Sequence, residues 1–599
     1  MMCVVTAFAR GTPVLRLRRG AFLAAMLTVL GASLSGCAGT SGFSGGLFST
    51  SKSESPYGAY LAGRHAASVN DNSEAAAFYD VALKDQPNDP IILERAFMAA
   101  VTAGDMKRAV PLAKRLVAIE PGQRMARLTL SLADVKNGNY AAARDEIAEA
   151  SPGPFTALVG VLASAWAAAG EGNKTLALEK LGAFEGRAAF SLFRAYHEAL
   201  MLEVLGDTEG AGQAYQEAME TSGGGSIRVI QAYASYLARN GRTDDARTLL
   251  ESFLALSPEH PLAADELRQL NAGKTPPPLV TDAAEGVAEA LYGLGSALAT
   301  DTSSNLAELY LNLALYMRPD FDIARSLLAG TYEAQERWAD AIAAYGKVGK
   351  GTPLYMNARI QSALALDRLG KEAEAIAVLE RLAKDDAKAV EPHVAMGDIY
   401  RAKEKYAEAA VQYDRAIALS GEPDERDWTL YYARGICAER LGEWEKAEAD
   451  LTLALELSDE HPLVLNYLGY SWIEQHHRLD EALAMIEKAV ERRPNDGFIV
   501  DSLGWARYRL GEYDLAVRYL ERAAELQPGD PTINEHLGDA LWKVGRKIEA
   551  RFQWRHALAL EPEKKREDIL RTKLDFGLEA GESAEKAENE KTAPAPAGS

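Results

Sequence analysis

The chain has 599 residues, a formal net charge of −21 and 48 % apolar residues, many of them alanine. It is too long for one compact core, which favours several domains or an array of repeats. The negative charge makes nucleic acid and anionic lipid surfaces poor partners. A composition rich in alanine and charged residues, with only 8 % aromatic residues, favours α-helix.

Residues 1–36 have the pattern of a bacterial export signal. Basic residues precede the short apolar run "AFLAAMLTVLGAS", and they are Arg10, Arg16, Arg18 and Arg19. This run is too short to remain as a membrane-spanning helix. The Leu-Ser-Gly-Cys at residues 34–37 resembles a lipobox, in which the cysteine is lipidated and becomes the new N-terminus. We therefore expect lipidation of Cys37; the alternative is an ordinary signal peptide followed by a chance cysteine.

Residues 37–56 are rich in glycine and serine and are expected to form a tether between the lipid and a folded body. Ala38, directly after the cysteine, favours the outer membrane over the inner one by the usual sorting rule for such lipoproteins. We therefore expect a lipid anchor in the outer membrane, facing the periplasm. Cys437 remains as a single thiol, which has no disulfide partner in the mature chain, and we expect it to be a buried apolar residue.

A first set of alanines recurs at intervals of 34 residues, with one interval of 35, between residues 57 and 258. The set is Ala75, Ala109, Ala143, Ala177, Ala211 and Ala246, and it predicts six repeats. Pro87, Pro121 and Pro258 close three of these units, because proline cannot continue a helix. Residues 259–287 contain "TPPPLV" and are predicted to be a linker between two blocks.

A second block, residues 288–562, has two sets of small residues in the same register, which predict eight repeats. One set is Gly295, Ala329, Ala363, Gly397, Gly435, Gly469, Gly504 and Gly538. The other is Ala307, Ala341, Ala375, Ala409, Ala447, Ala482, Ala516 and Ala550. Residues 563–580 are amphipathic and are expected to form a capping helix, and the polar residues 581–599 a disordered tail.

The 34-residue pattern resembles the tetratricopeptide repeat (TPR), a pair of antiparallel helices. The resemblance implies an all-α superhelix of about fourteen repeats in two blocks, with an inner groove lined by the first helix of each pair, helix A. A small residue on helix A is expected to face an alanine on the second helix, helix B, so that the two backbones approach closely. This packing accounts for the strict register of the small residues.

The sequence contains no convincing catalytic constellation. We find no phosphate-binding loop, no zinc-protease motif and no Cys/His cluster with metal-ligand spacing. His476 and His477 fall in a lengthened turn, where a solvated pair is more frequent than a metal site. We therefore expect a protein that is not an enzyme, has no cofactor or metal, and has no small-molecule substrate.

A superhelical groove predicts that the partners are other proteins. Counting the small helix-A residue as the eighth position, the groove-facing positions are the second, fifth, ninth and twelfth. In the last repeats these positions hold Asn466, Tyr470, Asp501, Trp505, Tyr508, Glu535, Asp539 and Trp542. Aromatic rings beside acids suit a peptide with basic side chains. The alternative is that the rings fill gaps between repeats, and we assign Trp472 to that role.

One known TPR function is tested by the same positions. Repeats that bind chaperone tails hold a C-terminal carboxylate with lysine at the fifth position and asparagine at the ninth. No repeat of the second block has this pair. The binding of cytosolic chaperone tails is therefore excluded.

The chain as a whole resembles the proteobacterial TPR lipoproteins of the LbcA kind. The resemblance rests on "LSGC", on two blocks of repeats, and on "LNYLGYSW", "VDSLGWARYRLG" and "HLGDALWKVG" in the second block. It implies an adaptor that recruits a periplasmic carboxyl-terminal processing protease to peptidoglycan hydrolases. The alternative is a structural TPR subunit of an outer-membrane assembly or of a polysaccharide export machine.

Overall fold

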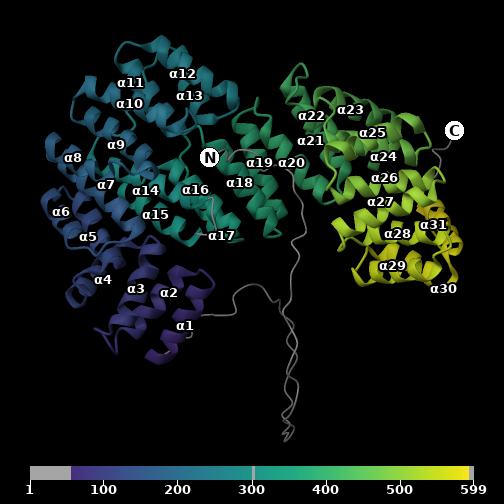
Figure 1. The fold of residues 1–599 in the computed structure, drawn as a ribbon, viewed down its shortest axis with the longest axis horizontal. Helices are drawn as coiled ribbons and strands as arrows, with labels where there is room; N and C mark the ends of the chain where they lie inside the picture. The colour runs from purple at the N-terminus through teal and green to yellow at the C-terminus, as the bar shows by residue number, and fades with distance from the viewer. Residues whose placement is uncertain (1–54, 300–303, 593–599) are drawn as a thin grey trace, which may run out of the picture. The chain divides into compact units, whose positions relative to one another are not determined.

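The computed structural model describes residues 55–299 and 304–592. Within these ranges the chain is all-α, with 31 α-helices, two short 3₁₀-helices and no strand (Figure 1). The chain divides into two compact units, unit 1 (Met1–Ala358) and unit 2 (Arg359–Ser599). The predicted export signal, Cys37, nearly all of the tether and the last seven residues lie outside the described residues.

Unit 1 contains six helix pairs, one single helix and two further pairs. In chain order they are α1 (Pro56–Ser68), α2 (Asn72–Ala82), α3 (Pro90–Thr102), α4 (Met106–Ile119), α5 (Arg124–Lys136), α6 (Tyr140–Ala148), α7 (Pro154–Gly170), α8 (Lys174–Leu181), η1 (Gly182–Phe184), η2 (Ala188–Phe190), α9 (Ser191–Val204), α10 (Thr208–Ser222), α11 (Ile227–Arg239), α12 (Thr243–Leu256), α13 (Pro261–Asn271), α14 (Ala283–Ala299), α15 (Ser304–Met317), α16 (Asp322–Ala334) and α17 (Trp338–Tyr345).

Unit 2 contains six helix pairs followed by two more helices, and its first helix begins four residues before the division. In chain order they are α18 (Tyr355–Arg368), α19 (Glu372–Asp385), α20 (Glu391–Ala402), α21 (Tyr406–Ser420), α22 (Trp428–Arg440), α23 (Trp444–Leu457), α24 (Pro462–Glu474), α25 (Leu479–Arg492), α26 (Gly497–Arg509), α27 (Tyr513–Leu526), α28 (Pro531–Lys543), α29 (Lys547–Ala559), α30 (Lys564–Phe576) and α31 (Leu578–Thr592). The described residues of the two units together contain fourteen pairs, as predicted.

Local sequence signals set the helix boundaries, as the last pair shows. The Asp530 side chain caps α28 by accepting a hydrogen bond from the backbone N–H of Ile533 at 3.0 Å. Pro531 follows at the first helical position, where its missing N–H costs nothing. Gly545, in the turn to α29, has a φ of +85°, which glycine adopts without strain.

The small residues of helix A do set the spacing between the two helices of a pair. The helix-B residues that they contact, however, differ from the predicted alanines. A Cβ atom added to Gly504 would lie 2.6 Å from Cγ of Leu520, which is four residues after the predicted partner Ala516. The same offset places Trp554 against Gly538 and Tyr413 against Gly397. The helix-A glycine therefore leaves room for a large side chain of helix B, and the buried alanine one turn earlier keeps the backbones close.

The predicted linker, residues 259–287, contains helical structure that the sequence analysis did not expect. It includes α13, whose Ala263 and Leu270 are buried, and the first turn of α14. Only the stretch between these two helices, which holds the prolines, is non-helical. The division between the units falls at residue 358, inside the predicted second block. Helices α14 and α15 pack with the N-terminal repeats, and α16 and α17 continue the stack from them.

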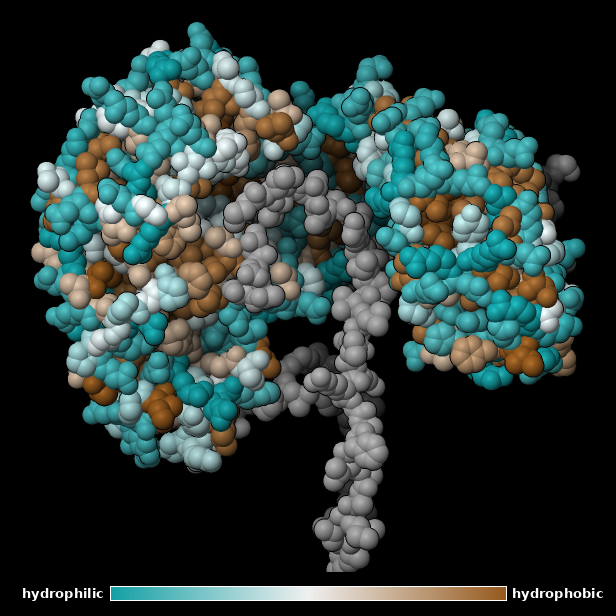
Figure 2. All heavy atoms as spheres, in the orientation of Figure 1, coloured by the Kyte–Doolittle hydropathy of each residue, from teal (hydrophilic) through white to brown (hydrophobic). Residues whose placement is uncertain are grey.

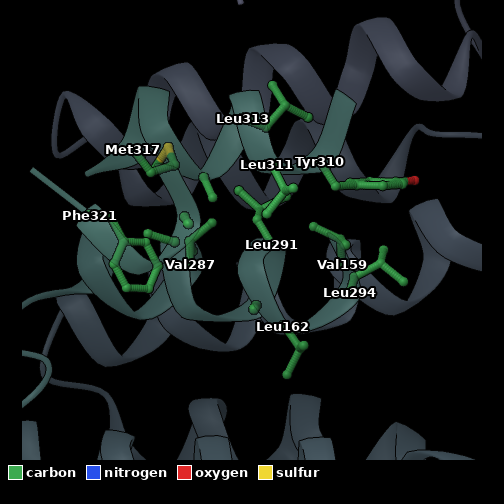
Figure 3. Packing of buried hydrophobic residues seen from close by; sticks show 14 of the residues in the cluster. Val159, Leu162, Val287, Leu291, Leu294, Tyr310, Leu311, Leu313, Met317 and Phe321 are labelled. Carbon is green, nitrogen blue, oxygen red and sulfur yellow. The ribbon is translucent and has the colours of Figure 1, made fainter. Parts of the chain in front are cut away.

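Helix α14 lies against the helix-A face of three of the six N-terminal repeats. It contacts α5, α7 and α9, which are helices A of three successive pairs, and Figure 1 shows it inside the arc of α1 to α13. Leu291 and Leu294 lie close to Val159 and Leu162 of α7 (Figure 3). Gly286 permits this contact, because a Cβ atom there would lie 2.2 Å from the indole of Trp166.

A buried ion pair fixes α14 in this position. Glu289 of α14 has a side chain that is 1 % exposed and pairs with Arg228 of α11, with Nε of Arg228 3.2 Å from Oε2. The N-terminal repeats therefore bind a segment of their own chain on their helix-A face, where the sequence analysis expected a groove.

The C-terminal segment also differs from the prediction. The capping helix is present as α30, but residues 581–592, predicted to be disordered, are helical in α31. Gly577, with a φ of +97°, turns the chain between the two helices. The buried side chains of Leu570 and Leu578 anchor this end of the chain, and this tertiary contact was not visible in the polar composition.

On the face that Figure 2 shows, the described surface of each unit is mostly hydrophilic, with hydrophobic residues in scattered groups. In the two described ranges we find no helix with the length and apolar character needed to cross a bilayer. Cys437 is fully buried and Trp472 is 4 % exposed, as expected for both.

Candidate protein-binding surface

Three successive helices A, α24, α26 and α28, carry all eight predicted binding residues and lie side by side in unit 2. We call the surface that they form the helix-A face of unit 2. Gly469, Gly504 and Gly538 position the helices by close packing against α25, α27 and α29. The predicted residues therefore do come together on one face, but their surroundings differ from one end to the other.

At the α24 end the side chains are partly exposed. Asn466 and Tyr470 both keep some contact with solvent. The Oδ1 atom of Asn466 is buried and has no hydrogen-bond donor among the described residues. Burial, together with the nearby carboxylates of Glu474 and Asp501, raises the pKa of Tyr470, so its hydroxyl stays protonated.

The middle of the face is a stack of aromatic rings. The indole of Trp505 lies parallel to the imidazole of His536, with centroids 4.0 Å apart, and to the ring of Tyr508 at 4.7 Å. Its Nε1 donates a hydrogen bond of 2.8 Å to Glu474. Trp505 is half-buried, so one part of its ring is available to a partner.

Asp501 fixes the imidazole in this stack. Its Oδ2 lies 3.0 Å from Nδ1 of His536, and both residues are buried. Burial lowers the pKa of His536, but the charge and hydrogen bond of Asp501, together with the charges of Glu535 and Asp539, outweigh burial and raise the pKa above the ordinary value. Asp501 is therefore engaged within unit 2 and is not free to bind a partner.

At the α28 end the acids are also engaged. Lys573 of α30 donates to Glu535 at 2.7 Å and to Asp539 at 2.6 Å, and all three residues are buried. Arg566 also donates to Glu535, at 2.6 Å. The expectation that Glu535 and Asp539 catch a partner's basic side chains does not hold in this structure, because α30 supplies the cations.

The two remaining aromatic residues lie under α31. Trp542 is 9 % exposed, and its Nε1 donates to Glu579 at 3.4 Å. Tyr508 is 8 % exposed, and its hydroxyl donates to Glu582 at 3.3 Å. The chain's own C-terminal helix therefore covers this part of the predicted surface.

Sequence reasoning missed Arg566 and Lys573 as members of this face. They are seven residues apart, so they lie on one side of α30, together with the buried Leu570. A basic pair on the apolar side of a helix that follows Glu535 and Asp539 is a signal that could have predicted the ion pairs.

Two surface hollows, of about 740 and 500 Å³, lie beside α19 and beside α27. Neither is lined by any of the eight predicted residues. Across the described parts of the chain, no group of three or more His, Cys, Asp or Glu side chains is arranged to hold a metal ion.

Sequence profiles of the tetratricopeptide repeat match residues 394–462 and 502–558, which span α20 to α23 and α26 to α29. A second profile of the same repeat matches residues 227–268. The chain contains tetratricopeptide repeats. Together with the fourteen helix pairs, these matches show that the fold is an all-α TPR solenoid, a fold that typically serves as a non-enzymatic scaffold for protein–protein interaction.

Two curated relatives share part of the sequence. The TPR repeat-containing protein PA4667 of Pseudomonas aeruginosa is 30 % identical over 197 residues, 32 % of each chain. The BBSome complex member BBS4 of Bos taurus is 30 % identical over 112 residues, 19 % of this chain and 20 % of BBS4. The chain thus spans about a third of the length of the first relative and a fifth of the second.

Solved structures with similar folds have low sequence identity. The Cut9 and Hcn1 hetero-tetramer of APC/C is 14 % identical, with a TM-score of 0.37, and the match covers 87 % of this chain and 96 % of that chain. Yeast Tom70 is 14 % identical, with a TM-score of 0.30, over 90 % of this chain and 97 % of that chain.

Proposed function

We propose that the protein is an adaptor that binds a partner protein at the α24 end of the helix-A face of unit 2. Trp505, Tyr470 and Asn466 make the contact. The observation that carries the proposal is that Trp505, Tyr470 and Asn466 are each partly exposed, whereas the other five predicted residues of this face are buried.

Physical chemistry favours a partner at this position. Rings that are held in place before binding provide contact area at little cost in conformational entropy. The uncovered end of the face therefore has the features of a site for an extended or helical protein segment.

The cellular setting is the second part of the proposal. The lipobox-like sequence at residues 34–37 supports a lipid anchor at Cys37, and the resemblance to LbcA-like lipoproteins supports the outer membrane of the bacterial envelope. In this setting the adaptor brings a periplasmic carboxyl-terminal processing protease to its peptidoglycan-hydrolase substrates. Substitution of Cys37 by alanine should release the chain from membranes and abolish its labelling with a fatty acid.

Affinity purification of the full chain from detergent-solubilised envelopes of its own bacterium tests the adaptor role. The Tyr470→Ala variant should recover less of the partner than wild type, whereas Tyr519→Ala, which removes a partly buried tyrosine from helix B of the same unit, should recover as much. Recovery of a protease or hydrolase supports the proposal. Recovery of an outer-membrane barrel instead contradicts it and favours a subunit of an assembly machine.

A further inference from the structure

Helix α31 carries a row of carboxylates that face other helices of unit 2. Glu579, Glu582 and Glu585 are three residues apart and so lie along one side of the helix. Glu579 accepts a hydrogen bond from Trp542, and Glu582 accepts one from Tyr508. Glu582 also lies 3.4 Å from the ammonium nitrogen of Lys543, and Glu585 pairs with Arg566. All three acids therefore have polar partners on α26, α28 or α30.

The surface beneath α31 combines aromatic rings with cations. We call it the α31 floor and define it as Tyr508, Trp542, Lys543, Lys547, Arg551 and Arg566. Lys547 and Arg551 lie over the Trp542 ring, 4.7 and 5.4 Å from its centroid. In a chain with a net charge of −21, four cations around two rings form a local surface complementary to an acidic helix.

Helix α31 is held to this floor more weakly than α30. Helix α30 buries Ile569, Leu570 and Lys573, whereas α31 buries only Leu578 and Gly581 among its described side chains. The side chains of Glu582 and Glu585 are 48 % and 36 % exposed, so their ion pairs contribute little free energy. A helix with so few buried contacts opens locally at low cost.

We propose that the α31 floor is a binding surface for an acidic helical segment of a partner protein, and that α31 is an intramolecular occupant which such a segment displaces. The segment carries carboxylates at positions i, i+3 and i+6 and small residues between them, as α31 does. This inference rests on the proposed function, because it names the chemistry of a partner segment that docks beside Tyr470 and Trp505.

The probe for the test is a labelled synthetic peptide of residues 577–592. In the wild-type full chain, α31 competes at a high effective concentration, so the peptide binds weakly. Gly581→Leu opens the floor, because even a Cβ atom at Gly581 would lie 2.3 Å from Cγ of Lys573. Fluorescence anisotropy should show at least tenfold tighter binding to the Gly581→Leu chain than to wild type.

Glu582→Lys is a second, milder variant, since it reverses an exposed charge against Lys543 and does not disturb the core. It should tighten binding of the peptide at least threefold. Ala587→Leu, on an exposed position of α31, is the matched control and should bind the peptide as wild type does. Circular dichroism of each variant shows whether the repeats remain folded.

Three results would overturn the inference. The first is equal binding of the peptide to wild type, Gly581→Leu and Glu582→Lys. The second is equal affinity for a peptide with glutamine at positions 579, 582 and 585, which would exclude recognition of carboxylates. The third is dimerisation of the Gly581→Leu chain in light scattering, which would make a second copy the occupant.

The inference and the proposed function can fail separately. If the peptide does not bind but envelope partners are still captured in a Tyr470-dependent way, the inference fails and the adaptor role stands. If neither peptide binding nor Tyr470-dependent capture occurs, both fail.

Discussion

The ammonium nitrogen of Lys573 lies 2.6 Å from Oδ2 of Asp539, and both side chains are almost completely buried. Burial alone would lower the pKa of Lys573, but the carboxylates of Asp539 and Glu535 outweigh it and hold the pKa above its ordinary value. Helix α30 is thus joined to α28 by a buried ion cluster, which makes it part of the folded unit.

Replacement of Lys573 by methionine should destabilise α30 strongly. The change leaves Asp539 buried without a cation and leaves Glu535 with Arg566 alone. The loss of one partner of a buried pair costs about 3–5 kcal/mol. Hydrogen exchange of the α30 amides measures the effect directly. Lys564→Met, at an exposed position of the same helix, is the control, and a cost below about 1 kcal/mol for Lys573→Met would show that the cluster adds little stability.

From the pair of His536 and Asp501 we predict that the free energy of unfolding of unit 2 depends on pH. The pKa of His536 is raised above its ordinary value of 6.5, so the folded state binds the proton more tightly than the unfolded state. Its contribution is fully present below pH 6.5 and is lost as the pH rises through the raised pKa. The other charged groups that act on it, Glu535 and Asp539, are also acids and work in the same direction.

His536→Gln should therefore lower the free energy of unfolding of unit 2 more at pH 5.5 than at pH 9. Urea unfolding followed by tryptophan fluorescence at the two pH values measures the difference. An equal loss at both pH values would mean that the imidazolium charge contributes nothing and that only its packing against Trp505 matters.

From the burial of Glu266 we predict that unit 1 loses stability as the pH rises to about 8. Burial raises its pKa to about 8, against a smaller opposite effect of Arg228 and of a hydrogen bond from Gln231. The neutral acid is therefore favoured in the folded state, and the associated stability is present below pH 4.5 and is lost as the pH rises to about 8.

Glu266→Gln mimics the neutral acid and should stabilise unit 1 at pH 8.5 by more than about 1 kcal/mol, the equivalent of one pKa unit. At pH 4.5 the variant and wild type should unfold alike. Calorimetric melting at the two pH values provides the comparison, and a variant that is less stable than wild type at pH 8.5 would contradict the prediction.

Gly504 tests the packing that produces the repeat register. A Cβ atom there would lie 2.6 Å from Cγ and 3.1 Å from N of Leu520, so Gly504→Ala should cost about 1–3 kcal/mol by overpacking. Gly529→Ala is the matched control, because nothing lies within 4 Å of its added Cβ and its φ is not positive. Denaturant unfolding should distinguish the two, and equal stabilities would refute the packing argument.

The helices and the repeat register could be predicted from the sequence. The packing of α14 on the N-terminal repeats, and of α30 and α31 on the helix-A face of unit 2, could not. The spacing of Gly504 and Ala516 reports contacts within one hairpin, which are local. The contacts of Glu289 with Arg228 and of Lys573 with Asp539 join residues that are 61 and 34 apart and belong to different hairpins. No periodicity encodes such pairs, because each is made once in the chain.

The same distinction explains the outcome for the candidate site. Periodicity placed all eight residues on one face, since position within helix A determines the side. It did not predict that Glu535, Asp539 and Trp542 are buried, because they are buried by α30 and α31, and these two helices lie outside the repeats. Tyr470, Asn466 and the half-buried Trp505 remain as the exposed part of the prediction.

Photo-crosslinking in the cells that produce the protein tests the central claim most directly. A benzoyl-phenylalanine at position 470 of the full chain samples the uncovered end of the helix-A face, and one at position 519 samples helix B of the same unit. The account predicts an adduct with a partner protein from position 470 and none from position 519. An adduct from position 519 alone, or equal adducts from both positions, would contradict it.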